Sequence, residues 1–94
     1  MIALFAALQE EIRPIRRRLG LRPEHGKAPI CSWRGTFLSR EIVLAQTGIG
    51  RGGAERTVQQ VLATHPIEGV ISVGFCGALV EELQVADVLV CSAV

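Results

Sequence analysis

Two adjacent glutamates and two glycine-rich turns carry the groups with which this chain could do chemistry. Glu10 and Glu11 follow the apolar stretch 2–6, and a carboxylate so placed can take a proton from water or a hydroxyl group. Glycine-rich turns at 48–53 and 74–78 each follow another apolar stretch. Glycines let the backbone approach a ligand closely, and the first N–H groups of a helix lack partners within it. From composition alone, however, both glutamates are better explained as first-turn helix residues that the helix dipole favours.

The elements predicted around these groups alternate between strands and helices. Apolar runs predict strands over 2–6, 41–46 and 69–75, and apolar residues at helical spacing predict helices over 9–19 and about 53–64. Strand–helix–strand units favour a parallel sheet with right-handed crossovers. Both glycine turns then lie at the C-terminal ends of their strands, which is where open α/β sheets bind ligands. The predicted inward residues of the two helices are Ile12, Ile15, Leu19, Val58, Val61 and Leu62.

Three segments are harder to assign. Pro14 lies inside the first predicted helix, so that helix is expected either to begin about two residues later or to be kinked. Short strands are predicted over 30–34 and 36–38, on either side of Gly35. The last apolar run, 85–94, is predicted as a further strand.

The tryptophan, the histidines and the arginine run outside the glycine turns are expected to have structural and not functional roles. Trp33 is expected to pack in the core or at a sheet edge. His65 fits a hydrogen-bonding position at the end of the second helix. His25 has no other ligand at suitable spacing, so an exposed loop histidine is expected and not a metal ligand. The run Arg16–Arg18 is expected to form a solvated helix face and not a nucleic-acid patch.

Composition restricts the class of protein. With 94 residues the chain forms one small domain at most, and 49% hydrophobic residues suit buried parallel strands. A net charge of +1 argues against nucleic-acid binding, and without a long apolar run we expect no membrane-spanning helix. Cys31, Cys76 and Cys91 fit no zinc spacing, which predicts reduced thiols in a cytoplasmic protein and no bound metal.

The first glycine turn also matches the G-x-G-x-x-G pattern of dinucleotide-binding folds. Such a fold needs an acid at the tip of the next strand to hold the ribose, and that strand ends at Gly74-Phe75-Cys76. Glu68 precedes that strand, so a dinucleotide site is the weaker alternative. No Lys-Ser/Thr pair follows the glycines, which excludes a P-loop for nucleoside triphosphates.

Four sequence blocks, in one order and at characteristic spacing, resemble a known family. They are Phe5-Ala-Ala-Leu-Gln-Glu-Glu-Ile12, Thr47-Gly-Ile-Gly-Arg51, Val73-Gly-Phe-Cys-Gly-Ala-Leu79 and Val85-Ala-Asp-Val-Leu-Val90. They are similar to the G-A-M-x-E-E, S-G-I-G-K, G-S-A-G-G-L and V-G-D-I-V blocks in the N-terminal half of the nucleoside phosphorylase / methylthioadenosine–S-adenosylhomocysteine nucleosidase family. The resemblance implies a three-layer α/β fold with a mixed sheet, of which residues 1–94 form the N-terminal part of a single domain.

This resemblance implies cleavage of the N-glycosidic bond between ribose and a purine, with water or phosphate as the nucleophile. Glu11 aligns with the carboxylate that orients the attacking water and the ribose hydroxyl groups. The substrate-binding residues that the resemblance implies are Ala7, Leu8, Gly48, Ile49, Gly50, Phe75, Cys76 and Gly77. Phe75 replaces a Ser or Thr and Ser72 replaces an arginine that hold phosphate in phosphorylases, so water is favoured. Arg51 is left as either an anion contact or a surface residue, and Asp87 is expected to be a turn residue.

We therefore expect hydrolysis of an adenine nucleoside of the methylthioadenosine/S-adenosylhomocysteine type, without a cofactor. The resemblance further implies methionine salvage in the cytoplasm and a homo-oligomer, commonly a dimer. The family domain is more than twice as long, and its second half carries the purine-binding loop, a second ribose carboxylate and the acid for the leaving base. The chain is thus expected to be an N-terminal piece with little or no activity alone. A phosphorylase that uses phosphate and a non-catalytic nucleoside-binding or dimerisation module are the alternatives.

Overall fold

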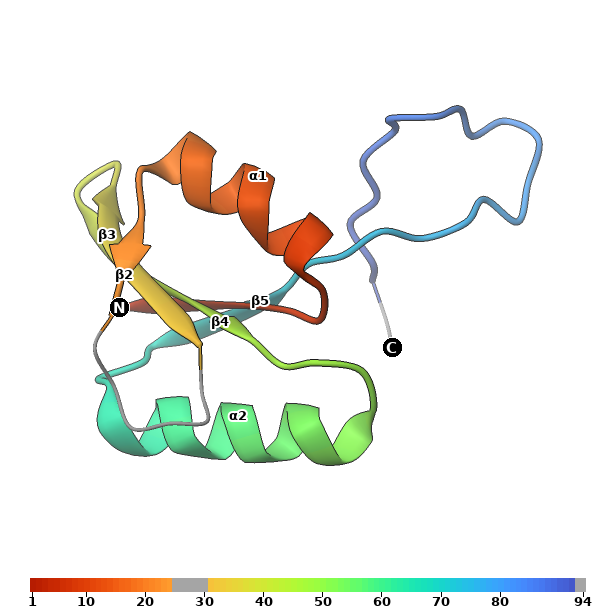
Figure 1. Cartoon of the computed structure of the whole chain (residues 1–94). Coiled ribbons are helices and arrows are strands. Elements are labelled where there is room, and N and C mark those ends of the chain that lie inside the picture. Colours follow the sequence, from red (N-terminus) through yellow and green to blue (C-terminus); the bar gives the residue numbers. More distant parts are fainter. Residues whose placement is uncertain (25–30, 93–94) are drawn as a thin grey trace.

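A mixed β-sheet between two helices organises the chain (Figure 1). The computed structural model describes residues 1–24 and 31–92. The described elements are β1 Ile2–Ala6, α1 Gln9–Leu19, β2 Arg22–Pro23, β3 Ser32–Phe37, β4 Arg40–Gln46, α2 Arg51–Thr64 and β5 Gly69–Ser72. Strands lie in the order β2-β3-β4-β1-β5; β1 is parallel to β4 and β5, whereas β2, β3 and β4 are antiparallel neighbours. This arrangement confirms the predicted three-layer mixed sheet.

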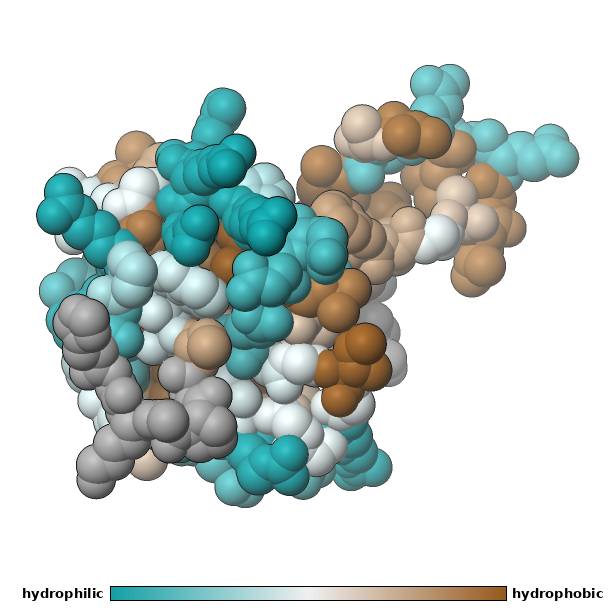
Figure 2. All heavy atoms as spheres, viewed as in Figure 1, coloured by the Kyte–Doolittle hydropathy of each residue, from teal (hydrophilic) through white to brown (hydrophobic). Residues whose placement is uncertain are grey.

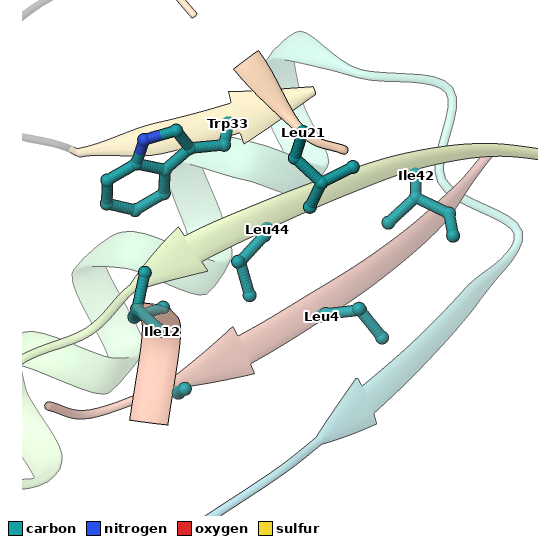
Figure 3. Packing of buried hydrophobic residues seen from close by; sticks show 7 residues of the cluster. Leu4, Ile12, Leu21, Trp33, Ile42 and Leu44 are labelled. Carbon is teal, nitrogen blue, oxygen red and sulfur yellow. The ribbon is translucent and has the colours of Figure 1, made fainter. Parts of the chain in front are cut away.

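Each face of the sheet packs against one helix because successive strand side chains point to opposite faces. The cluster on the α1 face contains Leu4, Ala6, Ile12, Leu21, Trp33, Ile42 and Leu44 (Figure 3). The cluster on the α2 face contains Met1, Ala3, Phe5, Val43, Ala45 and Val61. Burial of each large aliphatic side chain contributes roughly 1.5–3 kcal/mol, so the central strands β1 and β4, which serve both clusters, hold the layers together.

Helix α1 spans the predicted residues 9–19 and follows its predicted pattern. Ile12 is fully buried, and Ile15 and Leu19 pack against the core cluster as predicted. Gly20, at φ +64°, ends the helix in the left-handed conformation that glycine adopts readily. The helix begins at Gln9, which rules out the later start among the two alternatives for Pro14, and Pro14 lies inside the helix on its exposed side.

Helix α2 begins at Arg51, two residues before its predicted start, with Gly50 as the N-cap. Val61 is buried and Val58 packs against the core, as predicted. The prediction for Leu62 is wrong, because its side chain is 47% exposed and Thr57 takes the inward position one turn before Val61. Within the described ranges, no helix combines the length and apolar composition needed to cross a membrane.

Strand β3 is continuous, which corrects the two short strands predicted around Gly35. A Cβ atom on Gly35 would lie 2.7 Å from Leu21 Cδ2, so glycine here permits close packing and does not interrupt the strand. Leu38 and Ser39, at φ +50° and +64°, form the turn into β4. Trp33 is buried as predicted, with the Arg16 guanidinium 5.7 Å from its ring centroid. The predictions for His25 and Ile30 lie outside the described residues.

The chain after β5 leaves the sheet and carries exposed apolar side chains (Figures 1 and 2). The strand predicted over 85–94 is wrong for its described part, residues 85–92, in which Val85 and Val90 are 100% and 94% exposed. A strand needs a neighbouring strand to pair its backbone groups, and the described residues provide none for this segment. Asp87 accepts a hydrogen bond from the backbone N–H of Gln84 at 2.8 Å, which confirms its predicted position in a turn.

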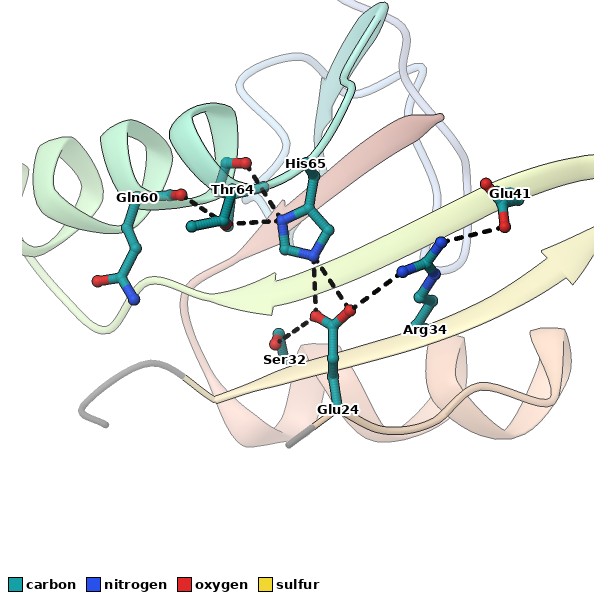
Figure 4. Close-up of polar contacts among 8 residues, drawn as sticks. Glu24, Ser32, Arg34, Glu41, Gln60, Thr64 and His65 are labelled. Carbon is teal, nitrogen blue, oxygen red and sulfur yellow. Dashed lines mark hydrogen bonds and ion pairs between the residues drawn. The ribbon is translucent and has the colours of Figure 1, made fainter. Parts of the chain in front are cut away.

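Several polar contacts join the segment after β2 and the start of β3 to the end of α2 (Figure 4). His65 Nε2 lies 3.0 Å from both carboxylate oxygens of Glu24, and the Ser32 hydroxyl donates to Glu24 at 3.0 Å. His65 Nδ1 lies 3.2 Å from the carbonyl oxygen of Val61, which confirms its predicted position at the helix end. Burial raises the pKa of Glu24, but hydrogen bonds from His65 and Ser32 and the charges of His65 and Arg34 outweigh it, so the pKa is lowered overall.

Glu24→Gln is expected to lower the free energy of unfolding by about 1 kcal/mol at pH 7, because an amide accepts weaker hydrogen bonds than a carboxylate. The pKa of Glu24 is lower in the folded state than the unfolded value of about 4.3. The contribution of the Glu24 carboxylate to the free energy of unfolding is therefore present above that pH and is lost as the pH falls through the folded pKa. Urea unfolding at pH 7 and at about pH 3 measures both effects.

Glu41→Gln is the matched control, since Glu41 also pairs with Arg34, at 3.1 Å, but is 56% exposed. Its effect at pH 7 is expected to stay below about 0.5 kcal/mol. Equal effects of the two substitutions, or a Glu24→Gln effect that persists unchanged at about pH 3, would contradict the assignment.

Candidate functional site

Three turns meet where the parallel strands β1, β4 and β5 end, at what we call the carboxyl edge of the sheet. The backbone N–H of Thr47 donates to the carbonyl oxygen of Ala6 at 2.9 Å, and that of Val73 donates to Phe5 at 2.9 Å. These bonds align the turn before α1, the glycine turn before α2 and the segment 73–77, which we call the β5 loop. The predicted position of both glycine turns at one sheet edge is confirmed.

The carboxylate of Glu11 connects two of these turns. Its Oε1 accepts hydrogen bonds from the backbone N–H groups of Ala7 at 3.2 Å and Leu8 at 3.0 Å. Its Oε2 accepts from the backbone N–H of Phe75 at 2.8 Å. The side chain is buried, with 9% of the residue exposed. Glu11 thus holds the start of α1 and the β5 loop, 64 positions apart in sequence, against each other.

Hydrogen bonding determines the ionisation of Glu11. The hydrogen bond from the Phe75 N–H lowers the pKa of this carboxyl most, and the bond from the Leu8 N–H lowers it next. Burial raises the pKa by a smaller amount, and the bond from the Ala7 N–H lowers it slightly further. Glu11 is therefore a carboxylate at neutral pH and can accept but not donate hydrogen bonds. A carboxylate has about four acceptor positions, of which three are used, so Oε2 can accept one further hydrogen bond from a water or a ribose hydroxyl.

Glycines make the close approaches at this edge feasible. A Cβ atom on Gly74 would lie 2.6 Å from Glu11 Oε2, and one on Gly53 would lie 2.7 Å from the carbonyl oxygen of Thr47. Gly48 and Gly50 have φ of +73° and +101°, which residues with a side chain rarely adopt. The glycine turn and the β5 loop therefore tolerate larger residues poorly at these positions.

The structure brings only part of the predicted site into direct contact among the described residues. Ala7, Leu8 and Phe75 all meet Glu11 through their backbone N–H groups. Gly48 and Gly50 lie on the neighbouring turn, and the Ile49 side chain is 85% exposed there. Phe75 is 74% exposed, and Cys76 and Gly77 are exposed further along the β5 loop.

The structure also shows the positions of three residues near the site whose roles the sequence did not determine. Glu10 is exposed in the first turn of α1, as expected of a residue favoured by the helix dipole. Arg51 pairs with Glu55 at 3.1 Å and is 92% exposed, so it occupies a surface position. Gly74 was predicted as part of the turn but not as a site residue, because its requirement for glycine arises from contact with Glu11, which no local pattern indicates.

Gly74→Ala is expected to push Glu11 Oε2 away from the Phe75 N–H and to raise the pKa of Glu11, since that hydrogen bond lowers it most. A carbon-detected NMR titration of the Glu11 carboxyl measures the shift. Gly77→Ala is the control, because a Cβ at Gly77 meets nothing within 4 Å. An unchanged Glu11 titration in Gly74→Ala would show that the close approach does not set the ionisation.

Comparison with known proteins gives consistent matches over most of the chain. The sequence model of the phosphorylase superfamily matches residues 1–94. A 5′-methylthioadenosine/S-adenosylhomocysteine nucleosidase from Staphylococcus haemolyticus is 32% identical over 90 residues, which are 96% of this chain and 40% of the relative. The corresponding nucleosidase from Staphylococcus aureus is 31% identical over the same shares of both chains. The chain thus spans about 40% of the length of the curated relatives it matches.

Solved structures show the same fold. A mutant of Helicobacter pylori MTAN with 5′-methylthioadenosine in its active site superimposes with a TM-score of 0.76 and 26% identity, covering 88% of this chain and 36% of that one. A futalosine hydrolase mutant from Helicobacter pylori superimposes with a TM-score of 0.75 and 26% identity, covering 92% of this chain and 40% of that one. The described fold is therefore similar to part of each of these chains.

Proposed function

This chain belongs to the phosphorylase superfamily, and from that premise we propose that it serves to hydrolyse the N-glycosidic bond of an adenine nucleoside of the methylthioadenosine/S-adenosylhomocysteine type. The observation that carries the proposal is the ionised Glu11 carboxylate, held by three backbone N–H groups at the carboxyl edge. The nucleosidases and the futalosine hydrolase to which the chain is similar support hydrolysis of a nucleoside. Residues 1–94 are proposed as the N-terminal part of a single domain.

In this mechanism Glu11 orients the attacking water. Hydrolysis forms a bond between the water oxygen and the ribose anomeric carbon and breaks the bond from that carbon to the base. The transition state resembles an oxocarbenium ion, so a carboxylate beside the ribose also stabilises the developing positive charge. The free acceptor position on Oε2 suits a hydrogen bond from the water, because the other positions are occupied by the backbone.

The proposed substrate-binding groups surround this carboxylate on the neighbouring turns. Ala7 and Leu8 lie at the start of α1, and the exposed side chains of Ile49 and Phe75 offer apolar surface to the nucleoside. Gly48, Gly50 and Gly77 allow the backbone to pass close to the ribose and purine, and Cys76 lies beside Gly77 on the β5 loop.

Water is the proposed nucleophile because groups suited to phosphate are missing from the end of β5 and from the β5 loop. Phe75 and Ser72 stand where the resemblance expects a phosphate-binding hydroxyl and an arginine. Arg51, which could have supplied a cation, pairs with Glu55. The proposal extends to a cytoplasmic homodimer in methionine salvage, supported by three free cysteines and by the exposed apolar side chains after β5.

Adenine release from 5′-methylthioadenosine in phosphate-free buffer tests this function. The acid for the leaving base belongs to the second half of the family domain. This chain alone is therefore expected to release adenine ~10²–10⁴ times more slowly than the Staphylococcus aureus nucleosidase. Direct titration with 5′-methylthioadenosine is expected to show binding that Glu11→Gln weakens and that Glu10→Gln, at an exposed neighbouring position, leaves unchanged.

Two outcomes would contradict the proposal. Release that requires phosphate would identify a phosphorylase and overturn the interpretation of Phe75 and Ser72. Equal effects of Glu11→Gln and Glu10→Gln on binding would remove Glu11 from the proposed position beside the ribose.

A further inference from the structure

A hollow of about 350 Å³ lies between the end of β4 and the first turns of α2. Its lining includes Gln46, Arg56, Thr57 and Gln60, together with the turn around Gly48. Helix α2 covers the sheet face opposite to α1 (Figure 1), so the hollow lies on the other side of the sheet from the helix that carries Glu11. Its volume is at the lower end of the roughly 300–1,000 Å³ of small-molecule sites.

The groups around this hollow carry positive charge. A Cβ on Gly52 would lie 3.4 Å from Arg56 Nη1, which places the guanidinium beside the first turn of α2. That turn contains no acidic residue, and the described lining of the hollow contains no Asp or Glu. The partial positive charge of the helix N-terminus therefore adds to the charge of Arg56.

The hydroxyl group of a largely buried residue also borders the hollow. Thr57 is 6% exposed and lines it, and its hydroxyl forms no hydrogen bond with another described residue. No fully buried side-chain polar atom among the described residues lacks a hydrogen-bond partner, so this hydroxyl is accessible from the hollow and can form a hydrogen bond with a molecule bound there.

We propose that this hollow binds a phosphate group, either free or on a small phosphorylated molecule, through Arg56, Thr57 and the first turn of α2. A guanidinium, a hydroxyl and the unpaired N–H groups of a helix N-terminus are donors that phosphate oxygens accept from well. The site is separate from the position at Ser72 and Phe75, where the family resemblance expects phosphate. The inference does not depend on the proposed hydrolysis, since neither Arg56 nor Thr57 takes part in it.

Cys31 offers a direct reporter because its exposed thiol also lines the hollow. In a chain with Cys76→Ser and Cys91→Ser, the rate at which a thiol reagent modifies Cys31 is measured against inorganic phosphate, with chloride holding the ionic strength constant. Saturable protection is expected. Arg56→Ala is expected to weaken it at least about tenfold, and Thr57→Val by a smaller factor, because charged hydrogen bonds contribute more than neutral ones.

Arg51→Ala is the matched control, since it removes the same charge from the same helix but lies outside the hollow. It is expected to leave protection unchanged. Absence of protection would show that phosphate does not bind in the hollow. Equal weakening by Arg51→Ala and Arg56→Ala would show a general effect of charge and would also contradict the proposed site. Stronger protection by ribose 5-phosphate than by inorganic phosphate would assign a phosphorylated small molecule, and equal protection would assign free phosphate.

Discussion

The buried carboxylate of Glu11 determines how the turns at the carboxyl edge are arranged. A charge removed from water must regain hydrogen bonds inside the protein, and Glu11 regains them from three backbone N–H groups. Ala7 and Leu8 belong to the turn before α1, whereas Phe75 belongs to the β5 loop. The ionisation of one side chain, the start of a helix and the path of a distant loop therefore depend on each other. The same contacts orient the carboxylate for the proposed attack by water.

The central strand β1 makes this contact feasible. It is parallel to β4 and β5, so the segments that follow all three strands emerge at the same edge. Its side chains alternate between the α1 cluster and the α2 cluster, which fixes both helices against one sheet. As a result, each sheet face presents its own polar group near that edge, Glu11 with α1 and the Arg56–Thr57 hollow with α2.

Periodicity and glycine placement predicted the central strands, both helices and the common edge of the two turns, because these features depend on local pattern. The features that were predicted wrongly depend on contacts between residues that are far apart in the sequence. Thr57 rather than Leu62 faces the core because the sheet sets the rotation of α2. Strand β5 ends early because the Phe75 N–H pairs with Glu11 and not with a strand. The apolar run 85–94 predicted a strand, but its described part has no neighbouring strand to pair with.

The most direct test of the central claim is a pH titration of backbone amide signals by NMR. If Glu11 holds the three N–H groups, the amide protons of Ala7, Leu8 and Phe75 will shift together with one apparent pKa below that of a free glutamate. If the Phe75 signal does not respond while those of Ala7 and Leu8 do, Glu11 belongs to the start of α1 alone. The β5 loop would then be positioned by something else, and the proposed site would lose its connecting carboxylate.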